Sequence, residues 1–171
     1  DIYVTGNLGD SYLGLKALSN KAKFKNKDKL FFVDKYYKPE LPLNLTKYLL
    51  KFANSSIDVS DGLIDDLAKM INRQSLSFHL FENKIPVSNK LSNLIKKQRL
   101  NKINLTSNGD DYQVLFTAGI KKARIIQNAS KATGIKITKI GKIVSGKDRS
   151  LIFDEKGKQI RAKSKGYIHQ F

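Results

Sequence analysis

The sequence has no cysteine, two histidines and three prolines among its 171 residues. Without cysteine, the chain can form neither a disulfide framework nor a thiolate metal site. His79 and His169 stand far apart, with no metal-ligand spacing between them. No apolar run approaches the ~20 residues of a membrane-spanning helix, and the first residues lack a signal-peptide pattern. The 40 % hydrophobic content nevertheless indicates a globular protein.

Negative charge is also scarce, with 15 Asp and Glu against 32 Lys and Arg, a net charge of +17. The surplus is mostly lysine and is spread along the chain. Such a surface attracts polyanions without defining a specific partner, and arginine, the usual reader of guanine and phosphate, is sparse. We therefore expect neither a specific nucleic acid nor a membrane as partner. Phosphorylated small molecules fit the same charge.

Short apolar runs alternate with stretches of helical periodicity, which predicts one α/β (or α+β) domain with helices flanking a mixed sheet. Lysine-rich residues 21–29 are expected to form an exposed loop or a helix end. The chain begins without Met at a strand-like run, so we expect residues 1–171 to be one domain of a longer polypeptide. The expected strands are 2–5, 77–81, 112–117, 135–144 and 150–153.

Acidic residues gather in the run Ile57–Leu63 (IDVSDGL) and in the helix that it starts. Asp58 and Asp61 stand three residues apart, with Ser60 between them, at a predicted strand-to-helix turn. Carboxylate oxygens suit Mg²⁺, while a hydroxyl and the N–H groups of a helix start suit a phosphate oxygen. The same residue types are also common helix caps, and taken alone they favour that structural role.

A second polar run, Thr106–Phe116 (TSNGDDYQVLF), leads two adjacent carboxylates into an apolar strand. Because neighbours in an extended strand point to opposite faces, Asp110 and Asp111 cannot both face one ligand there. We expect one to face a cleft and the other to be tied to the backbone or to a cation. Taken alone, the run also fits a turn with solvated aspartates.

The C-terminal run Lys165–Phe171 (KGYIHQF) is rich in aromatic residues. Such a tail usually docks on the core, although an exposed ring can stack on a flat ligand. These three runs, together with the opening Val4–Asp10 (VTGNLGD) and in this order, resemble the thiamine-monophosphate kinases of the aminoimidazole-ribonucleotide-synthetase-like superfamily. The family pattern is VTG-x-x-GD, D-[VI]-SDGL, GG-[ED]-DYEL-x-F and GY-x-HF. The resemblance extends over all 171 residues and implies the fold of the family's C-terminal domain.

The resemblance also implies roles for individual residues. Asp58 and Asp61 match the Mg²⁺ ligands, and Ser60 matches the residue that contacts an ATP phosphate. Asp110 matches the acidic residue beside the thiamine phosphate, and Tyr167 matches the aromatic residue that packs on the substrate. No side chain of this chain is assigned as a catalytic acid or base.

Several residues depart from the family pattern, and they lie on the substrate side rather than at the metal pair. Asn108 stands where the family usually has Gly, and Asp110 is often Glu. Gln113 replaces a Glu, Ile168 replaces an Asp, and Gln170 is inserted before the final Phe.

The implied reaction transfers a phosphoryl group from ATP to thiamine monophosphate, giving thiamine diphosphate. An acceptor phosphate needs no general base, so catalysis rests on alignment and on Mg²⁺ neutralising charge. In the family, a preceding N-terminal domain supplies further metal ligands, much of the nucleotide site and the dimer interface. We therefore expect this chain alone to be inactive, and the full-length protein to be a cytoplasmic homodimer.

Two alternatives stay open. One is another ATP-dependent enzyme of the superfamily, of the aminoimidazole ribonucleotide synthetase, selenophosphate synthetase or hydrogenase-maturation type. The other is a non-catalytic, lysine-rich binding domain. Tyr167 and the run Asp110–Tyr112 favour the kinase over its relatives. The aspartate pair of the central run favours any of these enzymes over a binding domain.

Overall fold

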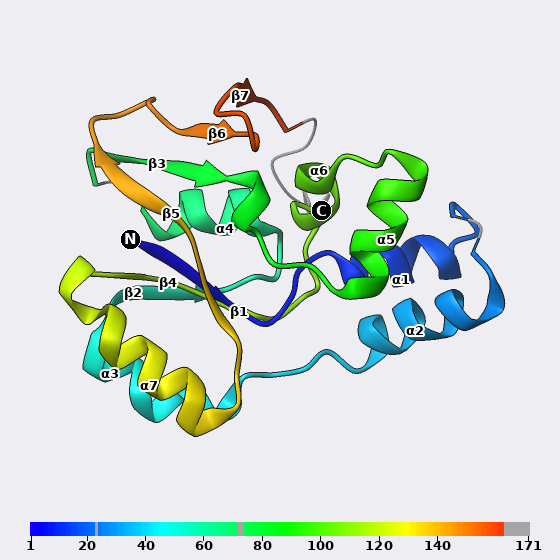
Figure 1. The fold of residues 1–171 in the computed structure, drawn as a ribbon, viewed down its shortest axis with the longest axis horizontal. Coiled ribbons are helices and arrows are strands. Elements are labelled where there is room, and N and C mark those ends of the chain that lie inside the picture. Colours follow the sequence, from blue (N-terminus) through cyan, green and yellow to red (C-terminus); the bar gives the residue numbers. More distant parts are fainter. Residues whose placement is uncertain (23, 72–73, 163–171) are drawn as a thin grey trace, which may run out of the picture.

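A seven-stranded mixed sheet forms the centre of the molecule in a computed structural model that describes residues 1–22, 24–71 and 74–162 (Figure 1). The strand order is β2-β4-β1-β5-β3-β6-β7. The β3–β6 pair is parallel and the other neighbours are antiparallel. The prediction of a mixed sheet flanked by helices is confirmed. The strands are β1 (Ile2–Thr5), β2 (Ala53–Asp58), β3 (Leu76–Phe81), β4 (Val114–Ala118), β5 (Ile137–Ser145), β6 (Leu151–Phe153) and β7 (Gln159–Ile160).

Alternation along the central strands divides the core between the two faces of the sheet. Val4 and Leu115 pack on one face with α4 (Leu63–Met70). Tyr3 and Phe116 pack on the other with α3 (Thr46–Phe52) and α7 (Ala123–Thr133). The helices α1 (Asp10–Leu18), α2 (Asn26–Tyr37), α5 (Asn89–Gln98) and α6 (Lys102–Thr106) gather at one end of the sheet (Figure 1). Single 3₁₀ turns occur at Leu43–Leu45, Glu82–Lys84 and Ile120–Lys122.

Helix α2 confirms the expectation of an exposed loop or a helix end at residues 21–29, because its first turn is residues 26–29. It runs over Asn26–Tyr37, although its inner surface is narrow: Phe32 is its only fully buried residue. Phe32 packs against Leu13 of α1 and stacks edge-on against Phe31. Tertiary packing on α1 therefore stabilises a helix that its polar sequence does not indicate.

Two aspartates are buried where α1 meets the entry to β4. Asp111 is 4 % exposed, and its carboxylate accepts a 2.7 Å hydrogen bond from the Gly9 N–H at the start of α1. Asp10 is 6 % exposed and accepts a 2.8 Å hydrogen bond from the Ser88 hydroxyl. Burial raises the pKa of Asp111 to about 8 and that of Asp10 to about 6. The expectation that one carboxylate of the Asp110–Asp111 pair is tied to the backbone is confirmed for Asp111.

Burial of Asp111 predicts a stability that falls as the pH rises. Its pKa lies near 3.8 in the unfolded chain and about 8 in the folded one, so the folded state binds more protons between these values. The contribution of Asp111 to the free energy of unfolding is greatest below about pH 4 and is lost as the pH rises towards 8. The free energy then falls by up to about 1.4 kcal/mol per pH unit. In urea unfolding from pH 4 to pH 8, Asp111→Asn should show a shallower decline than the wild type.

The matched control is Asp34→Asn, which removes an exposed carboxylate from α2. This variant should keep the wild-type slope, because its side chain is solvated in both states. Equal slopes for the wild type and Asp111→Asn would contradict the assignment.

Candidate functional site

Two polar loops lie side by side at one end of the sheet. Asp58, the last residue of β2, pairs with Val114, the first residue of β4. The pairing continues beyond both strands: the Val59 N–H donates to the Gln113 carbonyl (2.8 Å), and the Tyr112 N–H to the Val59 carbonyl (2.9 Å). The Asp110 N–H then donates to the Ser60 carbonyl at 2.9 Å. These hydrogen bonds join the loop at 58–62 to the loop at 108–113 as one unit.

Two glycines permit this close approach. Gly109 has φ +74°, and a Cβ on it would lie 2.1 Å from the Ser60 carbonyl oxygen. Gly62 has φ +128°, and a Cβ on it would lie 2.4 Å from the Ser107 carbonyl oxygen. Any other residue would meet both a steric overlap and an unfavourable backbone conformation at these positions. Each loop therefore contributes one glycine to the contact.

The joined loops bring three carboxylates near the hydroxyl group of Tyr112. Tyr112 is 40 % exposed and has φ +51°, so the run at 110–112 is not an extended strand. Partial burial raises the pKa of Tyr112, and the negative charges of Asp110, Asp58 and Asp61 raise it further. Burial also raises the pKa of Asp110, with a further contribution from Asp61. The structure thus brings together three of the aspartates that the sequence singles out.

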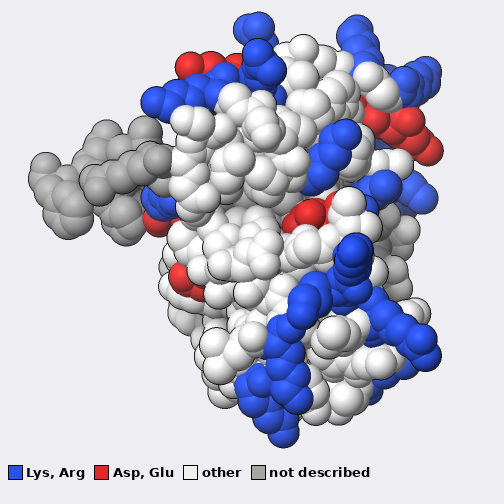
Figure 2. All heavy atoms as spheres, turned by 90° about the vertical axis from the view of Figure 1, so that its left-hand side faces the viewer, with Lys and Arg blue, Asp and Glu red and all other residues white. Residues whose placement is uncertain are grey.

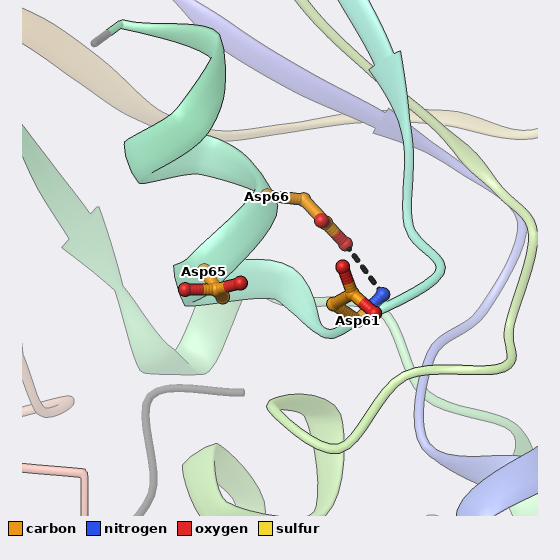
Figure 3. Close-up of side chains that lie close together, drawn as sticks. All are labelled: Asp61, Asp65 and Asp66. Atoms are coloured by element: carbon orange, nitrogen blue, oxygen red, sulfur yellow. Dashed lines mark hydrogen bonds between the residues drawn. The ribbon is translucent and has the colours of Figure 1, made fainter. Parts of the chain in front are cut away.

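A tighter acidic group lies at the start of α4 (Figure 3). Across residues 1–22, 24–71 and 74–162, one group of three acidic side chains has carboxylate oxygens within 4.8 Å of one another: Asp61, Asp65 and Asp66. The Lys69 ammonium forms an ion pair with Asp61 and lies 2.7 Å from Asp65 and 3.3 Å from Asp66. Asp58 is not a member, so the shared binding of Mg²⁺ by Asp58 and Asp61 stays a prediction.

Asp66 takes up the backbone N–H groups that the sequence suggests for a phosphate. Its Oδ2 atom accepts hydrogen bonds from the N–H groups of Ser60 (3.0 Å), Asp61 (2.9 Å) and Gly62 (3.0 Å). The residue pattern alone did not predict this role of Asp66. Its position one turn inside a helix that follows an Asp–Gly turn was the available signal, because a carboxylate there can reach back to the helix start.

The structure shows how two departures from the family pattern fit this chain. Gln113 is buried and accepts a 2.8 Å hydrogen bond from the Thr5 hydroxyl. Its amide group donates to the Glu40 carbonyl at 2.7 Å, which a glutamate carboxylate could not do. The Asn108 amide donates to the Asn104 carbonyl. Tyr167, Ile168 and Gln170 lie outside the described residues.

The surface charge agrees with the spread of lysine along the sequence. Figure 2 shows lysines and arginines in several separate groups on one face, with uncharged surface between them. Within the described part of the chain, no helix has the length and apolarity that crossing a membrane requires.

Comparison with known proteins identifies the relatives of this chain. No protein-family model matches it. The thiamine-monophosphate kinase of Buchnera aphidicola subsp. Schizaphis graminum is 35 % identical over 169 residues, which are 98 % of this chain and 52 % of that enzyme. The chain is a homologue of the thiamine-monophosphate kinases. This homologue spans about half the length of the relatives it matches.

Solved structures agree with the fold. The match to a structure described as AaThiL complexed with AMPPCP and TMP covers 99 % of this chain and 50 % of the AaThiL chain, with a TM-score of 0.75 and 28 % identity. The match to Escherichia coli HypE, a hydrogenase maturation protein, covers 98 % of this chain and 50 % of the HypE chain, with a TM-score of 0.72. At 14 % identity, HypE shows the shared fold alone. The expected similarity to the superfamily's C-terminal domain is therefore confirmed.

The contact between the two loops predicts a large cost for a methyl group at Gly109. Gly157 has nearly the same φ (+77° against +74°) but open space around an added Cβ. Gly157→Ala should therefore lower the free energy of unfolding by about 1 kcal/mol, which is the cost of the left-handed backbone conformation alone. Gly109→Ala should lower the free energy of unfolding by a further ~1–3 kcal/mol, because the added methyl group forces the two loops apart. Urea unfolding of both variants measures the difference, and equal losses would show that the loops do not depend on this contact.

Proposed function

We propose that this chain is the C-terminal half of an ATP- and Mg²⁺-dependent thiamine-monophosphate kinase. The observation that carries the proposal is the joining of the two loops, which gathers Asp58, Asp61 and Asp110 at one end of the sheet. The homology to thiamine-monophosphate kinases supports the reaction. The complex of AaThiL with AMPPCP and TMP supports the two kinds of ligand.

The residues at the start of α4 fit a divalent cation. Hard carboxylate oxygens are the donors that Mg²⁺ prefers, and one or two of them are enough when phosphates complete the shell. Asp61 already pairs with a cationic group, the Lys69 ammonium. In the proposal, Asp58 and Asp61 would hold Mg²⁺, which would neutralise negative charge between the phosphates of ATP and the phosphate of thiamine monophosphate. Because Asp66 occupies the backbone N–H groups, Ser60 contacts the ATP phosphate through its hydroxyl.

The chemistry requires little from this chain beyond alignment. An oxygen of the thiamine monophosphate phosphate attacks the γ-phosphorus of ATP, the bond to the β,γ-bridging oxygen breaks, and ADP leaves. The acceptor oxygen is already ionised at neutral pH, so no side chain has to remove a proton. In the proposal, Asp110 borders the thiamine phosphate and Tyr167 packs on the substrate. A preceding domain completes the nucleotide site and forms a homodimer.

A chimeric enzyme tests the proposal directly. This chain replaces the matching half of the Buchnera aphidicola relative, and the formation of thiamine diphosphate from thiamine monophosphate, ATP and Mg²⁺ is measured. Turnover supports the proposal. A folded chimera that binds Mg²⁺-ATP but does not phosphorylate thiamine monophosphate refutes the assigned substrate.

The metal assignment predicts a loss of activity without a loss of stability. In the chimera, Asp58→Asn and Asp61→Asn should each remove most Mg²⁺-dependent turnover, because an amide is a weak ligand for Mg²⁺. Their melting temperatures should change little. Asp148→Asn, at an exposed site near β6, is the control and should leave both quantities unchanged. A large drop in melting temperature with near-normal turnover would instead identify Asp58 and Asp61 as structural caps.

The substrate assignment predicts an effect of Tyr167 on one KM only. Loss of ring packing costs about 0.5–1.5 kcal/mol beyond burial, so Tyr167→Ala in the chimera should raise the KM for thiamine monophosphate several-fold. The KM for ATP should stay near its original value. Tyr37→Ala, which removes an exposed ring from α2, is the matched control. Equal effects of Tyr167→Ala on both KM values would contradict the assignment.

A further inference from the structure

Asp66 is the most completely buried acidic residue at the candidate site. It is 1 % exposed and lies on the first turn of α4. A single oxygen, Oδ2, accepts from three consecutive backbone N–H groups, those of Ser60, Asp61 and Gly62. The Asp66 N–H in turn donates to the Gly62 carbonyl at 3.0 Å. The loop and the helix are therefore joined in both directions through one residue.

The shape of the loop depends on these hydrogen bonds. Gly62 has φ +128° and ψ 151°, far from helical values, so the three N–H groups before α4 lie outside its regular hydrogen-bond ladder. Bonds from N–H groups to an ionised carboxylate are stronger than those to a neutral oxygen. The Asp66 carboxylate thus fixes the backbone of Ser60 and Asp61, and with it the positions from which their side chains extend.

Asp66 itself has little capacity left for a ligand. Its Oδ2 atom serves the three N–H groups, and its Oδ1 atom lies 3.3 Å from the Lys69 ammonium. Asp65, the preceding residue, offers a contrast. Asp65 is partly exposed, lies on the same turn of α4 (Figure 3), and pairs with the same ammonium at 2.7 Å. Two adjacent carboxylates thus carry equal charge but have different roles.

We propose that Asp66 is a positioning residue, which holds the 60–62 backbone so that Asp61 can bind a divalent cation. The inference rests on the proposed function, since it concerns the same metal. It adds that the metal affinity of Asp61 depends on a carboxylate that does not touch the metal. The orientation of the loop is the quantity that Asp66 controls.

The test uses this chain alone and two readouts that need no turnover. Amide hydrogen exchange reports the N–H groups of Ser60, Asp61 and Gly62. Paramagnetic broadening of the same amide signals by Mn²⁺ alone reports cation binding beside them. Asp66→Asn should speed exchange at the three amides at least tenfold and raise the Mn²⁺ concentration for half-broadening several-fold. Asp66→Ala should increase both the exchange rate and the half-broadening concentration more than Asp66→Asn does. The side-chain oxygen of Asn can still accept some of these hydrogen bonds, whereas Ala has no acceptor.

Asp65→Asn is the matched control, because it removes the same charge from the neighbouring position. It should leave amide exchange unchanged and raise the Mn²⁺ concentration less than Asp66→Asn does. Unchanged exchange in Asp66→Asn, or equal Mn²⁺ effects of the two Asn variants, would overturn the proposal. The proposal would also be overturned if Mn²⁺ did not broaden the loop signals of the wild-type chain. A chimera inactive towards thiamine monophosphate, by contrast, would refute the proposed function and leave these readouts intact.

Discussion

The candidate site depends on the backbone pairing that continues from β2 and β4 into the loops beyond them. The Val59–Gln113, Tyr112–Val59 and Asp110–Ser60 hydrogen bonds hold two segments together that are about fifty residues apart in sequence. Asp58 ends β2, whereas Asp61, Asp110 and Asp111 lie outside the helices and strands. Gly62 and Gly109 allow the approach, and the carboxylates of both loops then share one electrostatic environment.

The acidic residues of this basic protein have two distinct uses. Asp66 and Asp111 are buried, and each accepts hydrogen bonds from backbone N–H groups near a helix start. Asp58, Asp61 and Asp110 are less buried and lie near the Tyr112 hydroxyl. The first set accepts hydrogen bonds from the backbone, and the second set is partly or fully exposed to solvent. Burial, rather than sequence position, distinguishes the two uses, since Asp110 and Asp111 are adjacent.

The sequence predicted the sheet and the acidic turn that contains Asp58 and Asp61, but not that Asp110 lies near them, nor the residues that support the loops. Strong apolar runs indicated β1, β3 and β4, and the motif order indicated the family. The strand β2 has few apolar residues and α2 has a narrow inner surface, so their periodicity is weak. The role of Asp66 depends on the dihedral angles of Gly62, and those are set by the neighbouring loop. A single sequence does not reveal such contacts between distant segments.

The position of Lys69 determines the state of the carboxylates before any ligand arrives. Its ammonium is paired with Asp61, Asp65 and Asp66, and these hydrogen bonds raise the pKa of the amine. A divalent cation that binds Asp61 must therefore displace the Lys69 ammonium. In the proposed function, the binding of Mg²⁺ by Asp61 would therefore release the Lys69 ammonium from this carboxylate. A single ammonium thus offsets part of the negative charge of three carboxylates.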